Sequence, residues 1–233
     1  MDNSRILVIP DLHLPYQHID AIDFLTKLKK TLNPTRIICL GDELDYHALS
    51  FHDSDQDLFS AGEELRRAQA YISSIYELFP HMDVLESNHG SMAYRKAKHH
   101  GMPRSLLKSY SEILGTPDWK WHNKLIITLP NGRRCMFVHS YGANVLQSSQ
   151  SLGMSLVQGH HHSQFELRYW QSDYGELHFA ITSACLIDDV SYAFAYNKLQ
   201  VKRPILGVTF IENGMPYLIP MEVNSENRWV GTR

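Results

Sequence analysis

The chain has 233 residues, of which 43% are hydrophobic and 20% charged, and this composition suits one globular domain over residues 1–233 with a sizeable core. Its formal net charge of -3 provides no general basic field and so argues against binding to long nucleic acids or anionic membranes. No apolar run approaches the roughly 20 residues that a membrane-spanning helix needs.

The three cysteines, Cys39, Cys135 and Cys185, lie in strand-like runs and form no CxxC pair. Such thiols are typical of a buried core in a reducing compartment. The first residues lead directly into a strand-like run and leave no room for a signal peptide. We therefore expect a cytoplasmic protein, located in the host cytoplasm if the chain is viral. The sequence leaves the oligomeric state open.

Strand-like and helical runs alternate in the first half of the chain. The apolar spacing predicts strands at residues 6–10, 36–40 and 82–86, and helices at residues 18–30 and 60–79. Ser60 is suited to cap the second helix. Strands separated by helices are typical of βαβ units, so we expect a parallel sheet whose strands deliver residues to one edge at their carboxyl ends.

The second half of the chain is richer in strands. Residues 91–122 are predicted to form a helical insertion, which contains the densest basic cluster of the chain. The strand-like runs that follow cover residues 124–129, 134–139, 156–159, 165–170, 177–183, 206–211 and 217–221. Most of them are joined by hairpin signals such as Asn213-Gly214. The pattern predicts an α/β protein with two packed sheets covered by helices, and a loose tail over the last ten residues.

Residues that can bind metal ions follow several of the predicted strands. Asp11 and His13 come directly after the first strand and, two positions apart, point to the same side of an extended chain. The later positions of this kind are Asp42 with Asp45, Asn88 with His89, His139, and His160 to His162. A single Asp or His is usually a cap or a core hydrogen-bonding residue. Five such segments in this order favour one metal centre instead.

Carboxylates and imidazoles without thiolates suit transition metals such as Mn, Fe, Co, Ni or Zn, and argue against a structural zinc site. Two such cations bridged by a carboxylate generate hydroxide near neutral pH and clamp both ends of a displacement at phosphorus. Among the three consecutive histidines, His160 and His162 would face the same way on an extended chain, whereas His161 would face away.

The ordered series Asp-x-His, Gly-Asp-x-x-Asp, Asn-His, His and Gly-His-x-His resembles the calcineurin-like metallophosphoesterases over residues 6–162. The form of these motifs is similar to that in short phage and bacterial members, some of which are nucleotide phosphatases. The resemblance implies a four-layer α/β/β/α sandwich of two mixed sheets flanked by helices. It also implies two divalent transition metal ions as cofactors, with Mn preferred over Fe, Co, Ni or Zn.

The resemblance further implies a role for each motif residue. The seven implied metal ligands are Asp11, His13 and His162 for the first ion, Asn88, His139 and His160 for the second, and Asp42 as the bridge. His89 resembles the catalytic histidine of the family, which protonates the leaving oxygen or steadies the phosphoryl group. Asp45 resembles the carboxylate that orients this histidine, so its loss should lower the rate without emptying the site.

The sequence departs from the family pattern near the catalytic loop. Ser87 and Gly90 flank the Asn-His pair, where members usually have Gly and an acidic residue. Tyr46 stands where the protein Ser/Thr phosphatases have a phosphate-gripping Arg. The candidates for substrate contact are therefore Tyr46, His47, Arg95 and Arg104, with a surface salt bridge as the alternative role of each arginine. The aromatic residues that could stack on a base are Tyr46, Phe51, Tyr94, Trp119 and Trp121, although core packing is the commoner role.

Three functions follow for comparison. The first is hydrolysis of phosphate monoesters by attack of a metal-bridging hydroxide, and the favoured substrates are nucleoside or deoxynucleoside 5′-monophosphates. The binding partner is then a small phosphorylated substrate. The second is a phosphodiesterase acting on cyclic nucleotides or nucleic-acid ends, which only the basic insertion supports. The third is a non-catalytic binding module, against which the intact ligand set argues.

Overall fold

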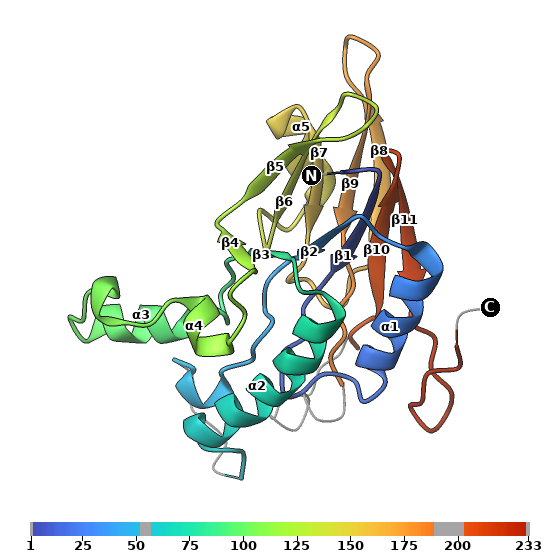
Figure 1. The fold of residues 1–233 in the computed structure, drawn as a ribbon. Coiled ribbons are helices and arrows are strands. Elements are labelled where there is room, and N and C mark those ends of the chain that lie inside the picture. Colours follow the sequence, from blue (N-terminus) through green and yellow to red (C-terminus); the bar gives the residue numbers. More distant parts are fainter. Residues whose placement is uncertain (1, 52–56, 189–202, 232–233) are drawn as a thin grey trace.

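The computed structural model describes residues 2–51, 57–188 and 203–231. In this part of the chain, two mixed sheets pack face to face, with helices on their outer faces (Figure 1). The α/β/β/α arrangement expected from the sequence is therefore confirmed. None of the helices in the described ranges is long and apolar enough to cross a membrane.

The first sheet has the strand order β11-β10-β1-β2-β3-β4. Its parallel strands are β1 (Arg5–Ile9), β2 (Arg36–Cys39), β3 (Asp83–Leu85) and β4 (Lys120–His122). The hairpin of β10 (Gly207–Glu212) and β11 (Met215–Pro220) joins β1 in antiparallel fashion. The carboxyl ends of these four parallel strands therefore lie at one edge of the sheet, as the βαβ pattern predicts.

The second sheet has the strand order β5-β6-β7-β9-β8. Its members are β5 (Leu125–Thr128), β6 (Arg134–Val138), β7 (Ser155–Gln158), β8 (Glu166–Gln171) and β9 (Leu177–Thr182). Strands β6, β7 and β9 run parallel, whereas β5 and β8 pair antiparallel at the edges. Both sheets therefore have a parallel centre with carboxyl ends that can deliver side chains to a common site.

The helices are α1 (Ala21–Leu32), α2 (Ala61–Leu78), α3 (Met92–His99), α4 (Tyr110–Leu114) and α5 (Val145–Leu152), with short 3-10 turns at η1 (His47–Leu49) and η2 (Arg104–Leu106). The α1 and α2 helices pack on the first sheet, and α5 packs on the outer face of the second. The segment with α3 and α4 projects to one side of this body (Figure 1).

The alternation of side chains along β1 explains the layers. Leu7 and Ile9 point to α1 and α2, where they join a core with Phe24 of α1. Ile6 and Val8 point the other way and fill the space between the two sheets. All four strand side chains are fully buried, so β1 is central to both layers of the core.

Three details differ from the sequence predictions. Residues 91–122 are only partly helical, because their end forms β4 and pairs with β3. The helix α5, between β6 and β7, was not predicted. The last ten residues were expected to be loose, but within the described range Arg228 forms two hydrogen bonds with Asp20, at 2.6 and 2.9 Å, and the Trp229 ring packs on Phe24. These contacts fix the segment on α1.

Candidate metal centre

The seven implied metal ligands all follow strand ends. Asp11 and His13 come after β1, Asp42 after β2, Asn88 after β3, His139 after β6, and His160 and His162 after β7. These strands run parallel within each sheet, so their loops gather at one end of the two-sheet core. Six of the seven residues are members of tight groups of side chains that could hold a metal ion.

Asp42 lies at the centre of the cluster. One of its oxygens, Oδ2, lies 3.4 Å from His13 Nε2 and 3.3 Å from His139 Nε2. The other oxygen, Oδ1, accepts a hydrogen bond of 3.0 Å from the backbone N–H of His89. One oxygen of Asp42 is thus shared by two imidazoles that belong to different ligand groups, which is the position that a bridging carboxylate requires.

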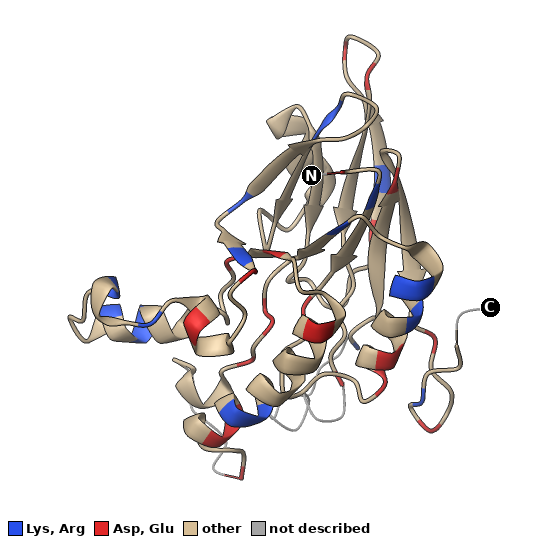
Figure 2. Cartoon of the chain, in the orientation of Figure 1, with Lys and Arg blue, Asp and Glu red and all other residues tan. Residues whose placement is uncertain are grey.

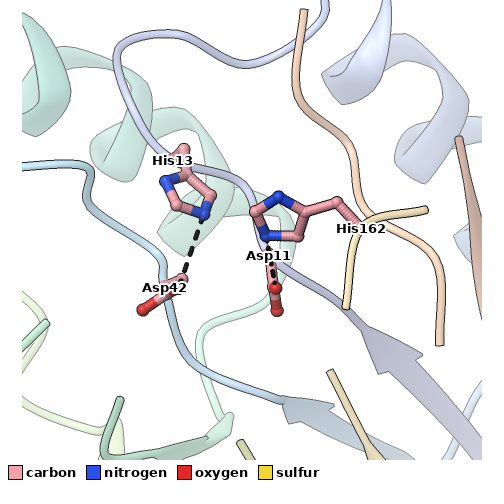
Figure 3. Close-up of side chains that lie close together, drawn as sticks. All are labelled: Asp11, His13, Asp42 and His162. Atoms are coloured by element: carbon pink, nitrogen blue, oxygen red, sulfur yellow. Dashed lines mark hydrogen bonds and ion pairs between the residues drawn. The ribbon is translucent and has the colours of Figure 1, made fainter. Parts of the chain in front are cut away.

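Asp11 connects the loop after β1 to the loop after β7. Its Oδ2 accepts a hydrogen bond of 2.7 Å from the backbone N–H of His160, and lies 2.9 Å from Nε2 of His162. Figure 3 shows this contact beside the His13–Asp42 pair. The second oxygen, Asp11 Oδ1, is buried and accepts no hydrogen bond. A buried carboxylate oxygen of this kind needs a partner, and a cation would supply one.

Two of the groups correspond to the two implied ion positions. Asp11, His13, Asp42 and His162 form one group, and Asp42, His139 and His160 form the other, with the ligand atoms of each within 4.8 Å of one another. Asn88 lies beside the second group, since its Oδ1 is 2.6 Å from His139 Nε2. Oxygen and imidazole donors around a shared carboxylate fit two divalent transition metal ions.

The carboxylates and imidazoles of the cluster shift each other's pKa values. Burial alone would raise the pKa of Asp42, but the charge of His139 and the hydrogen bond from His13 hold it well below its usual range. Burial likewise opposes protonation of the imidazoles, yet their contacts with Asp42 raise the pKa of His13 to about 10 and that of His139 to about 9. Metal binding would release the protons of these two imidazoles, because only a neutral imidazole is a ligand.

The backbone at the ligands is not extended. His13, Asp42 and His160 have left-handed φ values of 50°, 47° and 69°. His160 and His162 thus belong to two different ligand groups that share Asp42, and the left-handed backbone at His160 differs from the extended chain that the sequence analysis assumed. Left-handed conformations cost about 1–3 kcal/mol each in residues other than glycine, and they cluster at functional sites.

Two glycines allow the ligand loops to approach each other. A Cβ at Gly41, whose φ is 95°, would lie 2.6 Å from Leu85 O and from Ser87 Cβ. A Cβ at Gly159 would lie 2.5 Å from Asp11 Oδ1. A side chain at Gly41 would collide with the loop after β3, and one at Gly159 would displace the Asp11 carboxylate, so glycine suits both positions.

The departures at Ser87 and Gly90 have a local explanation. Ser87 Oγ accepts hydrogen bonds from the backbone N–H groups of Asp42 (2.8 Å) and Gly90 (3.1 Å), and so joins the two ligand loops. A Cβ at Gly90 would lie 3.0 Å from both Ser87 Oγ and Glu43 Oε1. Glu43 is 2% exposed, and burial raises its pKa to about 7. A buried carboxyl group from the neighbouring loop thus occupies the space in front of Gly90.

Asp45 contacts both His13 and His89. Its carboxylate lies 2.6 Å from His13 Nδ1, whereas His89 Nδ1 lies 3.7 Å from the carboxylate and 2.5 Å from the Asp45 backbone oxygen. A carbonyl oxygen can only accept, so Nδ1 of His89 carries a hydrogen. The carboxylate therefore orients a metal-ligand candidate, and the backbone of the same residue orients the catalytic-histidine candidate.

Glu64 of α2 is a supporting residue that the sequence did not reveal. Its carboxylate accepts hydrogen bonds from the backbone N–H groups of His47 (2.8 Å) and Ala48 (3.0 Å), at the start of η1. It is only 2% exposed. The turn that it fixes follows directly after Asp45. A buried carboxylate on the helix thus holds the segment that orients two histidines of the site.

We expect Glu64→Ala to lower the free energy of unfolding by about 2–4 kcal/mol, because each buried N–H left without an acceptor costs about 1–3 kcal/mol. Glu63→Ala is the matched control in the same helix, since Glu63 pairs with arginines at the surface and should change stability by less than about 1 kcal/mol. Urea unfolding of the three proteins measures both values. Equal effects of the two substitutions would contradict a supporting role for Glu64.

The difference in the free energy of unfolding between wild type and Glu64→Ala should depend on pH. Burial raises the pKa of Glu64 from 4.5 to about 7, although the two N–H donors act in the opposite direction. A carboxyl group with a raised folded-state pKa contributes stability that is complete below about 4.5 and is lost as the pH rises through about 7. The stability difference between wild type and Glu64→Ala should therefore be larger at pH 5 than at pH 8.

The four candidates for substrate contact differ in their surroundings. Tyr46 and His47 are buried, at 6% and 2% exposure, and Tyr46 belongs to the core beside α2. Arg104 pairs with Glu86 at 3.1 Å, which is the surface salt bridge named as its alternative role. Arg95 is exposed and contacts a ligand loop, because its Nη1 donates to the backbone oxygen of Asn88 at 3.3 Å. Among the four, Arg95 thus combines an exposed cationic side chain with a contact to a ligand loop.

His161 gives a direct test of the ligand register. It belongs to none of the metal-ligand groups among the described residues, whereas His160 and His162 each belong to one. We expect His161→Ala to retain near-normal metal binding and His160→Ala to weaken binding of one ion by roughly 10-fold or more. Metal titration followed by calorimetry measures both. A loss at His161→Ala as severe as that at His160→Ala would show that the register is wrong.

Comparison with known proteins supports the fold. No protein-family model matches the sequence, and no curated protein does. Among solved structures, the phosphoesterase YfcE from E. coli is similar with a TM-score of 0.52 and 11% identity, over 97% of each chain. Vps29 from Chaetomium thermophilum has a TM-score of 0.49 and 13% identity, over 98% of this chain and 93% of that one. At these identities the likeness to YfcE establishes the α/β/β/α fold alone.

Proposed function

We propose that the protein is a metal-dependent phosphoesterase that hydrolyses phosphate monoesters, with nucleoside and deoxynucleoside 5′-monophosphates as the best substrates. The observation that carries this proposal is Asp42, a buried carboxylate shared by two groups of metal-ligand side chains. Such an arrangement is suited to two cations that act on one phosphoryl group. The phosphoesterase fold of YfcE agrees with this chemistry.

The proposal assigns a role to each residue of the site. Asp11, His13 and His162 would hold one cation, Asn88, His139 and His160 the other, and Asp42 both. When bound, the cations supply a hydroxide nucleophile near neutral pH and neutralise the charge of the phosphoryl oxygens. His89, held through Nδ1 by the Asp45 backbone, would present Nε2 to the leaving oxygen. Arg95, beside Asn88, would contact the phosphate.

The test is phosphate release by purified, Mn-loaded protein from a panel of nucleoside and deoxynucleoside 5′-monophosphates. A bis-aryl phosphodiester is measured at equal concentration, and Asp42→Asn protein from the same purification controls for contaminating phosphatases. The proposal predicts fast release from the monoesters and a slow reaction of the diester, with both absent in the control. No release from any monoester by metal-loaded protein would overturn the proposal.

The same panel separates the two alternative functions. A fast diester and slow monoesters would establish a phosphodiesterase and direct attention to the basic residues of α3, several of which Figure 2 shows along the projecting helix. A protein that neither hydrolyses phosphate esters nor binds any transition metal would be a binding module. The intact donor set around Asp42 favours the enzyme.

A further inference from the structure

Phe51 differs from the other aromatic residues near the site in its exposure. It is 48% exposed, whereas Tyr46 and Trp119 are 6% and 4% exposed. Trp121 packs against the core, and the Tyr94 hydroxyl donates to Lys108 O while its ring packs on Tyr110. Of the five aromatic candidates, Phe51 is thus the one with a half-exposed ring.

Basic side chains of α3 surround this ring. Lys96 Nζ lies 4.5 Å from the ring centroid, the Arg95 guanidinium lies 5.2 Å from it, and the His99 ring meets it edge-on at 6.1 Å. Phe51, Arg95, Lys96 and His99 are called the rim cluster below. Cation–π contacts at an exposed site are weak, so a ligand can displace the cations from the ring.

The rim cluster adjoins the metal-ligand cluster. Arg95 Nη1 donates to the backbone oxygen of Asn88, and the side-chain oxygen of Asn88 lies 2.6 Å from His139 Nε2. If a phosphate is held between the metal ligands, Arg95 is its nearer neighbour in the rim cluster, and the Phe51 ring lies beyond Arg95. Moving outward from the metal ligands, the groups are therefore the anion site, the cation and the aromatic ring.

We propose that the rim cluster binds the leaving group of the substrate, and that this group carries a nucleobase which stacks on Phe51 while Arg95 and Lys96 attract the phosphate. This inference rests on the proposed function and adds its specificity determinant. A nucleoside 5′-monophosphate has its planar base and its phosphate at opposite ends, which matches the order of groups here. Stacking on a phenylalanine accepts any base, so the cluster selects for nucleotides without selecting one base.

The substitution Phe51→Leu tests the proposal, because leucine retains apolar bulk and removes the ring. Its kinetics are compared for adenosine 5′-monophosphate and for glycerol phosphate, which has no ring. We expect kcat/KM for the nucleotide to fall roughly 5- to 150-fold, mainly through KM, which is the range that stacking of one base supports. The value for glycerol phosphate should not change. Tyr174→Leu is the control, since Tyr174 is 96% exposed in the turn between β8 and β9.

A parallel loss on both substrates, or no loss on the nucleotide, would overturn the proposal and leave the phosphatase activity standing. If the wild type hydrolyses neither substrate, calorimetric binding of the same two compounds to the purified protein decides the question. The proposal then requires tighter binding of the nucleotide, and loss of most of that advantage in Phe51→Leu. Equal binding of the two compounds to the wild type, or an advantage that survives the substitution, would overturn it.

Discussion

Asp42→Asn is expected to abolish phosphate release and to reduce bound metal from about two ions per chain to less than one. The substitution removes the negative charge that faces His13 and His139 at 3.4 and 3.3 Å. It retains the size of the side chain, and asparagine tolerates the left-handed backbone at φ 47°. The loss would therefore come from the missing charge and not from a changed loop.

The control for this substitution is Asp23→Asn, an isosteric change at an exposed position in the first turn of α1. It should leave metal content and activity unchanged. Circular dichroism and thermal unfolding must show that Asp42→Asn remains folded, since removal of one member of a buried charged group costs about 3–5 kcal/mol. A folded Asp42→Asn protein with two bound ions would exclude Asp42 as the bridge.

His89→Ala is expected to retain both metal ions and to lower kcat by about 10²- to 10⁴-fold, the usual contribution of general acid–base catalysis. His89 belongs to a group with His13 and Asp45 and to neither of the groups proposed for the ions. Its Nδ1–H donates to the Asp45 backbone oxygen, so Nε2 is the proposed proton donor. Burial and the charge of His13 lower the pKa of His89 below its usual value.

The leaving group distinguishes the two roles open to His89. A proton donor matters for a poor alkoxide leaving group and little for p-nitrophenolate, so His89→Ala should slow alkyl phosphates far more than p-nitrophenyl phosphate. Equal losses on both would show that His89 steadies the phosphoryl group. His89→Asn is the matched variant, because its amide N–H can replace Nδ1–H toward Asp45. Full activity of His89→Ala would remove His89 from the reaction.

The sequence predicted the layers of the fold and the grouping of the site residues because both depend on local patterns. Apolar runs such as residues 6–9 are buried on both faces of a strand, and the ligand motifs follow these runs directly. Parallel strands then bring the motifs together whatever the details of the loops. For this reason Asp11 and His162, 151 positions apart, could be placed in one site.

The elements that were missed depend on tertiary contacts. The strand β4 contains Lys120 and His122 and becomes a strand by pairing with β3. The helix α5 is rich in serine, which has only moderate helix propensity, and it is stabilised by its Asn144 cap and by burial of Val145 on the second sheet. The terminal segment is held by long-range contacts, among them the hydrogen bonds of Arg228 and Trp229 to the buried Asp20. The periodicity of apolar residues in the sequence does not predict such contacts.

Glu64 illustrates the same limit within the site. In the sequence it is one of two adjacent glutamates in the first turn of α2, where acidic residues are common. Only the packing of α2 against η1 distinguishes it from the exposed Glu63. The Asn88 and His139 pair, by contrast, was implied by the resemblance of the ordered motifs, and each residue lies in the loop after a strand of the parallel core.

The metal content of the purified protein is the most direct test of the central claim, that Asp42 joins two cation sites. The measurement is elemental analysis after loading with Mn and removal of free metal, on wild type and Asp42→Asn. The account predicts about two ions per chain in the wild type and a joint loss of both in the variant. A wild type with one ion or none, or a variant that loses a single ion, would contradict a shared bridging carboxylate.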